Sequence, residues 1–450
     1  MPGTETFLLL HPGDPWAGAW GRRLELKPHM VYLYSLLREH FEVSVLDLDT
    51  ELERPTNAAE HERFRVATVE RVLAFETDIL GISCWSSLSY LSARHIAEEV
   101  RRRRPSTRIV VGGYHPTLVP EDFTEPGSPF DHVVRGEVGS LLAALGRMAG
   151  ARDTLAVRPD YRAYPYFRSH QAAGVYLSLG CPYSCSFCME YARTWRPLPV
   201  DDAVALVTDL ARRDGFEYVM LFDACFGLDR RWRRAFLSGL VEAAVPCWLW
   251  LETRVDLLDD EDLDLLARLR VKVDLGVDSF SPAMLEIMGK TRDPEAYLGR
   301  FLQISERCNA LGILHDAFLI FNHPGETAAT LAQTMDFIRR RVEPSLVGGH
   351  LRLRGQSFAI FPGSHVAEHL EEYRRTYGTR VLVPDWWRRQ GDHAALARYV
   401  IPSLDADQRP FTADLAPVEE TLSAFNARSR DADTWKRLAA FGGADPLTPA

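Results

Sequence analysis

The sequence predicts an α/β protein built from two successive parallel sheets and a smaller C-terminal region. Its 450 residues are enough for two or three domains. Short apolar segments alternate with longer segments whose apolar residues recur every three or four positions, the spacing of a helix with one buried face. The short segments are rich in β-branched residues and nearly continuously apolar, which is typical of parallel strands covered by helices on both faces.

The first alternation, over residues 1–145, predicts a doubly wound parallel sheet. Five strands are expected, at Phe7–Leu10, Val43–Leu48, Ile79–Ser83, Arg108–Gly112 and His132–Arg135. Two helices are expected between them, at Met30–His40 and Ser89–Arg103. Ligands of such sheets bind at the carboxyl ends of the strands, so the loops at those ends are candidates for a binding site.

The second alternation, over residues 171–361, predicts six more strands with helices between them. These strands are expected at Val175–Leu179, Tyr218–Phe222, Trp248–Leu251, Val273–Val277, Ala317–Phe321 and Leu351–Phe358. Residues 146–170 are polar and rich in turn-forming residues, and we interpret them as a linker. Residues 362–450 contain helical pieces without a recognisable motif, so a small C-terminal cap is expected there.

Composition and charge narrow the class of protein. The 52 basic and 62 acidic residues give a formal charge of −10, which argues against a nucleic-acid partner because such proteins carry a basic face. No apolar stretch is long enough to span a bilayer, and the N-terminus lacks a signal-peptide pattern. We therefore expect a cytoplasmic protein with neither a membrane nor a nucleic-acid partner.

Three of the seven cysteines form a compact motif, Gly180-Cys181-Pro182-Tyr183-Ser184-Cys185-Ser186-Phe187-Cys188. A structural zinc site and a cubane cluster held entirely by protein would each use four ligands. Three thiolates leave one iron of a 4Fe-4S cluster open to a small molecule. A chance cluster or an incomplete zinc site is the alternative interpretation. The other cysteines stand singly in apolar surroundings and are expected to be buried thiols, at Cys84, Cys225, Cys247 and Cys308.

Charged residues lie at the ends of the next expected strands. Asp223 follows one strand and is interpreted either as a ligand contact or as a helix N-cap. Alternation places Trp250, Glu252 and Arg254 on one face of the following strand. Burying such charges is costly unless they are paired or bind a ligand. Glu252 and Arg254 are thus candidate contacts for a ligand, with a structural ion pair as the alternative.

The segment Phe321-Asn322-His323-Pro324-Gly325-Glu326-Thr327 places two polar residues at another strand end. We expect Asn322 and His323 to face the site and to recognise a substrate. His323 is a candidate for moving protons, because the pKa of an unperturbed histidine lies near neutrality. A structural or exposed loop histidine is the alternative.

These ordered motifs resemble the radical S-adenosylmethionine (radical SAM) superfamily, including the aromatic residue before the last cysteine. The resemblance implies a partial (β/α)6 barrel and a 4Fe-4S cluster whose open iron binds SAM. An electron from a donor such as flavodoxin or ferredoxin then cleaves SAM to a 5′-deoxyadenosyl radical. Implied cluster ligands are Cys181, Cys185 and Cys188; implied SAM contacts are Phe187 beside the adenine, Asp223 to the amino group, Arg254 to the carboxylate and Asp278 to the ribose. Asp278 and the pair Asn322-His323 depart from the family, which has Glu and Gly-Leu at these places.

The N-terminal region resembles the cobalamin-binding domain that precedes many radical SAM barrels. Matching segments are Gly112-Gly113-Tyr114-His115-Pro116-Thr117 and Val133-Val134-Arg135-Gly136-Glu137. The chain has no Asp-x-His-x-x-Gly motif, so no residue resembles the histidine that ligates cobalt in the methionine-synthase type of domain. The resemblance leaves open whether cobalamin binds and whether His115 is structural or contacts a ligand.

Two enzymatic hypotheses and one non-enzymatic hypothesis follow from these resemblances. The first is hydrogen abstraction from a small polar or cationic natural-product intermediate followed by loss of water, as in the radical SAM diol-dehydratases of aminoglycoside antibiotic biosynthesis, with Glu252 and His323 as candidate catalytic residues. The alternative is cobalamin-dependent methylation, which consumes a second SAM and yields S-adenosylhomocysteine. A cluster-bearing sensor is the third, and it would leave the SAM-site residues without a role.

Overall fold

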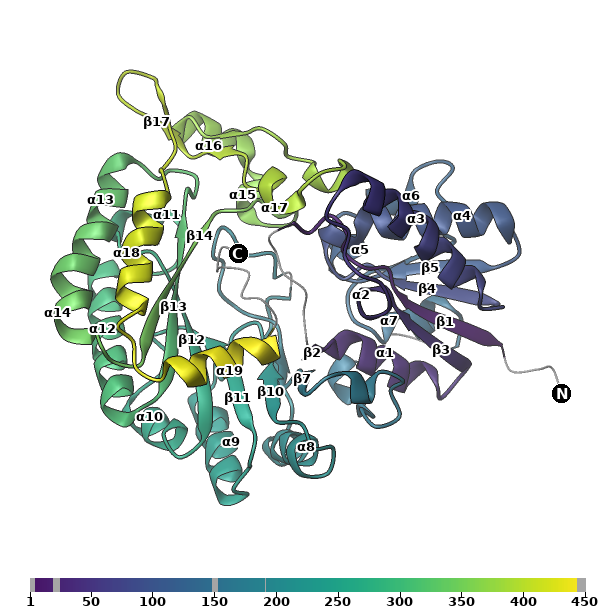
Figure 1. Cartoon of the computed structure of the whole chain (residues 1–450), viewed down its shortest axis with the longest axis horizontal. Coiled ribbons are helices and arrows are strands. Elements are labelled where there is room, and N and C mark those ends of the chain that lie inside the picture. The colour runs from purple at the N-terminus through teal and green to yellow at the C-terminus, as the bar shows by residue number, and fades with distance from the viewer. Residues whose placement is uncertain (1–4, 19–24, 148–152, 191, 443–450) are drawn as a thin grey trace. The chain divides into compact units, whose positions relative to one another are not determined.

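The structure is a computed structural model that describes residues 5–18, 25–147, 153–190 and 192–442 (Figure 1). The chain forms two compact units. The first comprises the N-terminal segment to residue 22 with residues 26–169 and 385–397, and the second comprises residues 23–25, 170–384 and 398–450. Of the expected linker, residues 148–152 lie outside the described part of the chain. The expected cap is divided, because residues 385–397 belong to the first unit.

The first unit contains a five-stranded parallel sheet in the order β3-β1-β4-β5-β6, which confirms the predicted doubly wound fold. Its strands are β1 (Thr6–His11), β3 (Glu42–Asp47), β4 (Ile79–Ser83), β5 (Arg108–Gly112) and β6 (His132–Val134). Its helices are α1 (Pro28–Leu37), α2 (Leu48–Glu51), α3 (Ala58–Leu73), α4 (Tyr90–Arg103), α5 (Tyr114–Leu118), α6 (Glu121–Thr124), α7 (Ser140–Ala144) and α17 (His393–Leu396). Every residue of the central strand β4 is buried, as expected for a strand covered on both faces.

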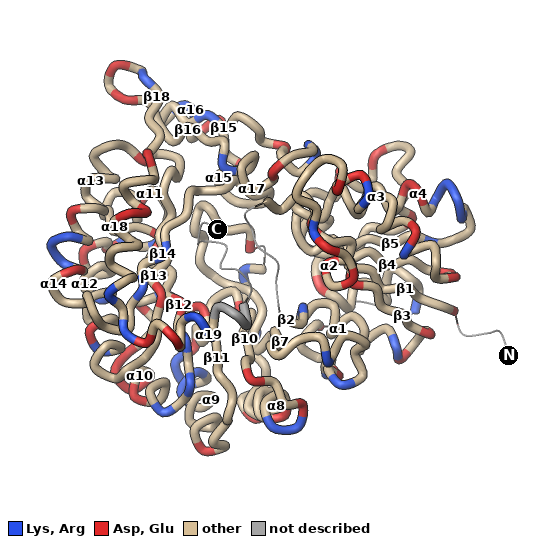
Figure 2. The backbone as a smooth tube through the Cα atoms, in the orientation of Figure 1, with Lys and Arg blue, Asp and Glu red and all other residues tan. Residues whose placement is uncertain are grey.

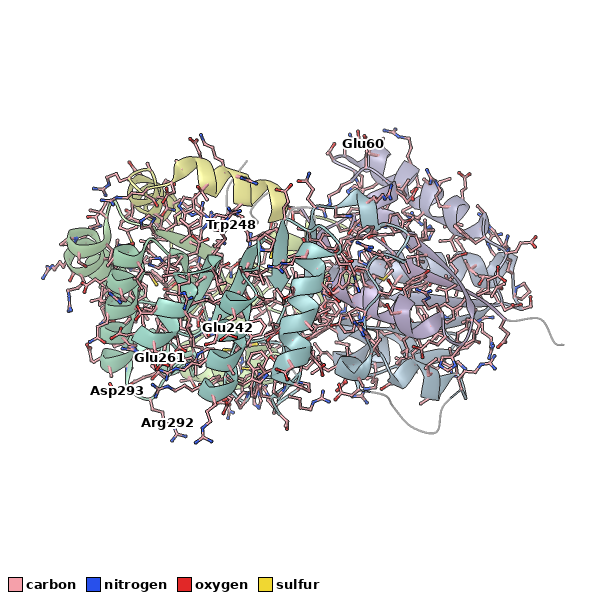
Figure 3. All side chains as sticks on the ribbon, turned by 90° about the horizontal axis from the view of Figure 1, so that it is seen from below. Glu60, Glu242, Trp248, Glu261, Arg292 and Asp293 are labelled. Atoms are coloured by element: carbon pink, nitrogen blue, oxygen red, sulfur yellow. The ribbon has the colours of Figure 1, made fainter. Side chains whose placement is uncertain are left out.

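Side chains at the helix ends explain where the helices of this unit begin. The Asn57 side chain accepts a hydrogen bond from the Glu60 amide (3.1 Å), and the Glu60 carboxylate accepts one from the Thr56 amide (2.8 Å). The first bond satisfies an amide that the first turn of α3 leaves without a helical partner, and the second ties the residue before the cap to the helix. Glu60 is labelled in Figure 3, on this helix.

The second unit contains a sheet whose six successive parallel strands run β14-β13-β12-β11-β10-β7, with Glu25 of the short β2 (Glu25–Leu26) at the edge beside β7. The six strands are β7 (Ala172–Val175), β10 (Tyr218–Leu221), β11 (Trp248–Thr253), β12 (Arg270–Asp278), β13 (Leu314–Phe321) and β14 (Leu351–Ser357). They confirm the predicted partial barrel. The expected strand Val175–Leu179 is divided, because β7 ends at Val175 and β8 (Ser178–Leu179) instead pairs antiparallel with β9 (Arg196–Pro197).

Helices lie between the barrel strands and after the last of them. They are α8 (Val200–Arg212), α9 (Arg230–Glu242), α10 (Asp260–Leu266), α11 (Pro282–Ile287), α12 (Pro294–Leu311), α13 (Ala328–Phe337), α14 (Glu343–Leu346), α15 (His365–Glu368), α16 (Leu370–Tyr377), α18 (Ala416–Asn426) and α19 (Ala432–Gly442). The longest, α12, begins at an Asp293 cap with Pro294 in its first turn and ends at Gly312 with φ 73°. Asp293 is labelled in Figure 3.

The C-terminal helices α18 and α19, yellow in Figure 1, complete the second unit. Asn426 at the end of α18 exchanges two hydrogen bonds of 2.8 Å with the backbone of Leu353 in β14. Trp435 of α19 joins an apolar cluster with Tyr218 and Leu314, which lie on barrel strands. These contacts make part of the expected cap a covering of the barrel sheet.

Acidic and basic residues are interspersed along the outer helices of the second unit, as Figure 2 shows. Arg234, for example, pairs with Asp259 at 2.7 Å, and Arg307 pairs with Asp264 at 2.6 Å. No helix among the described residues has both the length and the apolar character needed to cross a membrane.

Candidate functional site

The three clustered cysteines lie on a loop that begins directly after β8. All three are half-buried free thiols. The Cys181 amide donates a hydrogen bond to the Ala192 carbonyl (2.8 Å), which holds the start of the loop, and the Cys188 amide donates one to the Cys185 carbonyl (3.0 Å), which forms a turn within it. Burial raises the pKa of each thiol, that of Cys188 to about 11. Iron binding would therefore have to displace protons from these sulfurs.

The Cys188 sulfur accepts a hydrogen bond from the Glu190 amide at 3.4 Å. Amide hydrogen bonds to sulfur are one of the means by which a protein adjusts the potential of an iron–sulfur cluster. Gly180, directly before the motif, has φ 82°, and a Cβ there would lie 2.2 Å from the Thr194 carbonyl oxygen. The start of the loop therefore requires glycine.

The four single cysteines, Cys84, Cys225, Cys247 and Cys308, are buried, as predicted. Burial raises the pKa of all four thiols. They fit the predicted role of small apolar core residues.

Asp223 is buried two residues after the end of β10. Its carboxylate accepts hydrogen bonds from the Leu177 amide (2.8 Å), the Ser178 amide (3.0 Å) and the Ser178 hydroxyl (2.6 Å). Burial raises its pKa to about 6. A carboxylate has about four acceptor sites, so Asp223 can hold the β7–β8 connection and still accept one more donor.

Arg254 is buried beside the cysteine loop, with its guanidinium 3.9 Å from the centre of the Tyr183 ring. It donates two hydrogen bonds to Asp256 (2.9 and 2.7 Å) and one to the Lys290 carbonyl (2.9 Å). Its Nη1 atom is buried without a hydrogen-bond partner. A buried donor of this kind is costly unless a ligand satisfies it.

Asp278 ends β12 with φ 71°, an uncommon backbone conformation for a non-glycine residue. Its carboxylate pairs with the ammonium of Lys290 at 2.6 Å, and both side chains are nearly fully buried. The Lys290 carbonyl also accepts the bond from Arg254. The structure thus brings the predicted Asp278 and Arg254 together through a lysine that sequence reasoning assigned no role.

Glu252 is exposed on β11, whereas Arg254 is buried. The ion-pair partner of Arg254 is Asp256, so the alternative of a structural Glu252–Arg254 pair does not describe the site. Further down the barrel, Asp316 pairs with Lys272 (2.9 Å) and with Arg352 (3.0 Å). Arg352, with His350 and Arg354, is expected from the alternation of the sixth strand as a weaker candidate, whereas Lys272 and Asp316 were missed, although the alternation of Lys272 and Asp274 in β12 is the pattern that would have revealed them.

His323 is completely buried after β13 and does not face open space. Its Nδ1 lies 2.8 Å from the Pro324 carbonyl, and its Nε2 lies 2.9 Å from the Ser186 hydroxyl. Burial lowers its pKa to about 4, so the ring is neutral at pH 7. Asn322 likewise has a structural role, because its side-chain oxygen accepts a hydrogen bond from the Ala413 amide (2.7 Å). The expected substrate-facing pair thus forms internal contacts.

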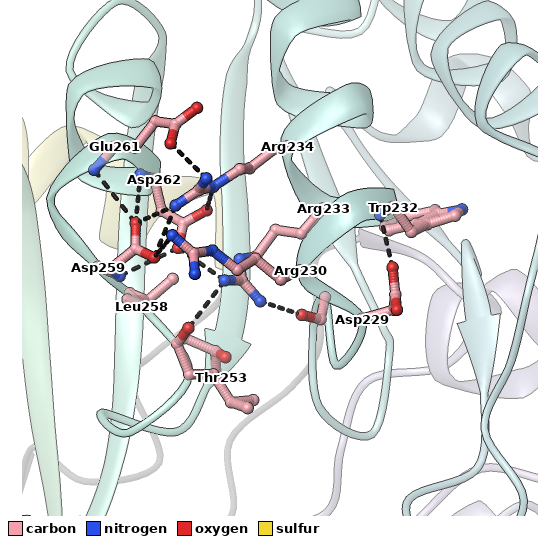
Figure 4. Close-up of polar contacts among 12 residues, drawn as sticks. Asp229, Arg230, Trp232, Arg233, Arg234, Thr253, Leu258, Asp259, Glu261 and Asp262 are labelled. Carbon is pink, nitrogen blue, oxygen red and sulfur yellow. Dashed lines mark hydrogen bonds and ion pairs between the residues drawn. The ribbon is translucent and has the colours of Figure 1, made fainter.

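A second buried arginine joins the loops that follow β10 and β11 (Figure 4). Arg233 donates to the Gly227 carbonyl (2.5 Å), to the Leu257 carbonyl (2.8 Å) and to Asp262 (2.7 Å). Because Asp223 and Arg254 begin these loops, the Arg233 contacts fix the two strand ends relative to each other. Arg233 was not predicted from the sequence, because an arginine within a helical pattern gives no indication that it is buried.

The first unit has its own set of loops at the carboxyl ends of its strands. His115 is fully buried, with Ser87 at 2.9 Å from Nδ1 and Asp122 at 3.0 Å from Nε2, so it has the structural role that the sequence left open. Trp85 stacks on His29 with ring centres 4.3 Å apart and meets Tyr114 edge-on at 4.8 Å. Trp85 and Tyr114 are half-buried, which leaves part of an aromatic surface accessible at these loops.

These residues can be tested against the cofactors that the sequence implies. Three thiols on one loop fit an iron–sulfur cluster with one open iron. The buried, unpartnered Nη1 of Arg254 fits the carboxylate of SAM, and the remaining acceptor site of Asp223 fits an ammonium group. In the first unit, a Cβ on Gly136 would meet only open space, and the aromatic surface of Trp85 suits a large apolar ring system.

Comparison with known families agrees with both resemblances. Residues 28–146 match the B12 binding domain family, and residues 175–338 match the Radical SAM superfamily. The chain therefore carries a B12-binding domain followed by a radical SAM domain. The expected cofactors, a 4Fe-4S cluster and SAM, follow from the second domain, and cobalamin follows from the first.

Curated relatives are distant. The chain is 23% identical over 315 residues to the anaerobic magnesium-protoporphyrin IX monomethyl ester cyclase of Rubrivivax gelatinosus, covering 60% of this chain and 55% of the cyclase. It is 23% identical over 357 residues to bacteriochlorophyllide d C-8(2)-methyltransferase of Chlorobaculum tepidum, covering 71% of this chain and 73% of that enzyme. The chain thus spans about half the length of the first relative and about three quarters of the second.

Among solved structures, the radical S-adenosylmethionine methyltransferase TsrM of Kitasatospora setae has a similar fold. Its structure with tryptophan and a SAM analogue aligns with a TM-score of 0.62 and 18% identity, covering 96% of this chain and 90% of that one. A second structure of TsrM contains cobalamin and a [4Fe-4S] cluster and aligns equally well, with a TM-score of 0.62. At this identity the likeness shows a shared fold over nearly the whole chain.

Proposed function

We propose that this chain, with its B12-binding and radical SAM domains, is a cobalamin-dependent radical SAM methyltransferase that acts on a small polar molecule. The observation that carries the proposal is the presence of both family matches on one chain, at residues 28–146 and 175–338. Methyl transfer uses both domains, since cobalamin serves as the methyl carrier and the cluster with SAM generates a radical.

The residues of the second unit would perform binding and orientation. Cys181, Cys185 and Cys188 would hold the cluster, and Arg254 would use its unpartnered Nη1 to bind the SAM carboxylate. Asp223 would accept the SAM amino group at its remaining acceptor site, as expected from the sequence. Phe187 beside the adenine and Asp278 near the ribose remain proposals from the resemblance. The exposed Glu252 on β11 is a candidate substrate contact.

The first unit would bind cobalamin without the use of His115 as a ligand. His115 lies in the matching segment, but Ser87 and Asp122 occupy its two ring nitrogens. We therefore assign cobalamin binding to contacts of the strand-end loops, including the aromatic surface of Trp85 and Tyr114.

Radical dehydration, the reaction that sequence analysis placed first, is the weaker proposal. Dehydration does not require cobalamin, so it would leave the B12-binding match at residues 28–146 without a use. The relatives compared above are a cyclase and methyltransferases, and none is named as a dehydratase. An aminoglycoside substrate consequently lacks support, whereas a small polar substrate and an external electron donor remain part of the proposal.

Anaerobic reconstitution of the full chain with iron, sulfide and hydroxocobalamin tests the proposal. After desalting, we expect cluster absorbance together with about one cobalamin per chain. On reduction with SAM, S-adenosylhomocysteine should form in proportion to bound cobalamin, and 5′-deoxyadenosine should form in proportion to cluster. Formation of 5′-deoxyadenosine without retained cobalamin or S-adenosylhomocysteine would reject methyl transfer in favour of a dehydration-type reaction.

Two single-cysteine variants, one in the cluster loop and one in a helix, provide a matched comparison. Cys181→Ala should abolish the cluster and 5′-deoxyadenosine formation by more than about a thousandfold, because no cluster means no electron for SAM cleavage. It should leave cobalamin retention unchanged, since cobalamin belongs to the other unit. Cys308→Ala, which removes a buried thiol from α12, should retain both cofactors.

A further inference from the structure

His323 occupies a position where the related turn has an apolar residue, yet it is completely buried in the second unit. Its ring has two polar partners. Because the Pro324 carbonyl at 2.8 Å can only accept, Nδ1 must carry the proton. Nε2 is then an acceptor, and the Ser186 hydroxyl at 2.9 Å must donate to it. Geometry therefore fixes one neutral tautomer of His323.

Ser186 stands between the second and third cysteines of the cluster loop. Besides the bond to His323, its amide donates to the Met288 carbonyl (2.9 Å) and its carbonyl accepts from the Val366 amide (3.0 Å). The middle of the cluster loop is thus fixed from three directions, by the segments after β12, β13 and β14. Two of these contacts are made by the backbone, whereas the contact with His323 is made by side chains, as is the approach of the Tyr373 hydroxyl to Ser186.

The His323 ring also packs edge-on against neighbouring aromatic rings. Ring centres lie 5.0 Å from Phe358, 6.4 Å from Tyr373 and 6.4 Å from Phe187. Phe187 precedes the third cysteine and is the residue proposed to lie beside the adenine of SAM. Fixing the His323 ring therefore constrains both Ser186 and the aromatic face that SAM would meet.

We propose that His323 is a positioning residue that sets the conformation of the cluster loop at Ser186 and Phe187 rather than a proton carrier. This role rests on the proposed cluster and SAM site. A ring whose two nitrogens are both engaged inside the protein has no path to exchange protons with a substrate. It can, however, keep Cys185 and Cys188 in fixed positions through the residue between them.

Replacing His323 alone or together with Ser186 gives a sharp test, because the single variant should be impaired and the double variant should behave nearly like the wild type. His323→Leu restores the apolar residue of the related turn but removes the imidazole acceptor of the buried Ser186 hydroxyl and leaves it only the Tyr373 hydroxyl as a side-chain neighbour. The holoprotein should therefore lose its cluster to an iron chelator about tenfold faster. At equal cluster content, the change that SAM induces in the EPR spectrum of the reduced cluster should require about five- to tenfold more SAM.

The double variant Ser186→Ala/His323→Leu replaces both partners by apolar groups and should return within about twofold of the wild-type values. Tyr373, whose hydroxyl also approaches Ser186, keeps His365 as a neighbour at 3.4 Å in this variant. His315→Leu is the matched control, because His315 is equally buried at the start of β13. It should lower thermal stability without changing chelator loss or the response to SAM.

Unchanged cluster loss and SAM response in His323→Leu would overturn the positioning role. So would a double variant as impaired as His323→Leu, which would show that the ring itself does more than hold Ser186. Failure of the proposed function gives a different result, since a wild-type chain that assembles no cluster fails before any variant is compared. Methyl transfer can also fail while the cluster and SAM measurements still decide the role of His323.

Discussion

Each unit contains a His-Pro pair shortly after a parallel strand, at the start of helix α5 in the first unit and in the turn after β13 in the second, and the two histidines differ in what they bond to. In the first unit His115 follows β5, and in the second His323 follows β13. Both side chains are fully buried, and both ring nitrogens have partners. The same local motif thus produces an internal histidine at both places.

The partners of the two rings are different in charge and in origin. His115 bonds to the carboxylate of Asp122, which also accepts from the Trp387 indole (2.7 Å) and pairs with Arg388. These C-terminal residues therefore become part of the first unit. His323 bonds to neutral groups, one of which belongs to the cluster loop. His115 stabilises the scaffold of the first unit, whereas His323 contacts the loop proposed to hold the cluster.

A histidine near a strand end is therefore not informative by itself. Sequence reasoning treated His115 as structural or ligand-binding and His323 as catalytic or structural. In the structure, the two histidines are distinguished by the residue that bonds to Nε2. This residue is Asp122 for His115, 7 positions along the chain, and Ser186 for His323, 137 positions away. Neither separation is visible as a local pattern.

The largest effect is expected from breaking the network of the first unit. Asp122→Ala removes a fully buried carboxylate and leaves His115 and the Trp387 indole without their partner. We expect a loss of about 3 kcal/mol in the stability of this unit. Hydrogen exchange should accelerate in residues 113–124 and 385–397, while cluster content in the second unit stays unchanged. Glu121→Ala, an exposed neighbour on α6, serves as the control and should exchange like the wild type.

If Asp122→Ala also lowered cluster content, the network would not be confined to the first unit. Such a result would remove the distinction between a scaffold histidine and a cluster-loop histidine. Protection that persists in residues 385–397 would instead show that the contacts of Trp387 and Arg388 contribute little.

Periodicity was sufficient to predict the architecture. The five strands of the first sheet and the six of the barrel come from short apolar segments whose burial leaves few alternatives. The division of the expected strand Val175–Leu179 was not predictable, because it depends on where Asp223, 46 residues from Leu177, accepts backbone bonds. The return of residues 385–397 to the first unit depends on Asp122 in the same way.

A smaller effect is expected from the arginines that pair with aspartate in each unit. Arg388 is part of the Asp122 scaffold, whereas Arg254 pairs with Asp256 and keeps a buried Nη1 without a partner. Arg254→Lys keeps the charge but replaces the three nitrogens of the guanidinium fork by a single ammonium, which cannot bond to Asp256 and to a ligand in the same geometry. SAM affinity, measured by EPR titration of the reduced cluster, should fall by about tenfold or more.

The exposed Arg270 at the start of β12 provides the comparison for this variant. Arg270→Lys should bind SAM like the wild type. Equal SAM affinity in Arg254→Lys would contradict the assignment of Nη1 to the SAM carboxylate and would make Arg254 another scaffold arginine, like Arg388.

The cluster loop itself was the most predictable part of the site, because its ligands are adjacent in sequence and chemically distinctive. The residues around it were harder to assign. Asp223, Arg254 and Asp278 do lie at strand ends of one sheet, but Lys290 and Arg233 act through contacts that fold-level patterns do not encode. Their roles follow from burial, since a buried charge must find partners.

The carboxyl groups beside the two histidines, Asp122 and Glu326, have pKa values that are shifted in opposite directions. Burial alone would raise the pKa of Asp122, but hydrogen bonds from His115, Arg388 and Trp387 outweigh it and lower the pKa. Asp122 therefore contributes stability that is lost as the pH falls. Burial raises the pKa of Glu326 to about 7, against the hydrogen bond from the Asn322 amide.

A glutamate in the unfolded chain has a pKa of about 4.3, so the folded state alone retains the proton of Glu326 between about pH 4.3 and 7. Stability of the second unit should consequently fall as the pH rises through this window. Glu326→Gln still offers an oxygen to the Asn322 amide but cannot ionise, and relative to the wild type it should gain about 2 kcal/mol of stability between pH 5, where the two should be similar, and pH 8. Thermal unfolding at the two pH values measures this difference. A variant that is equally destabilised at both would show that Glu326 is ionised in the folded protein, as Asp122 is in the first unit.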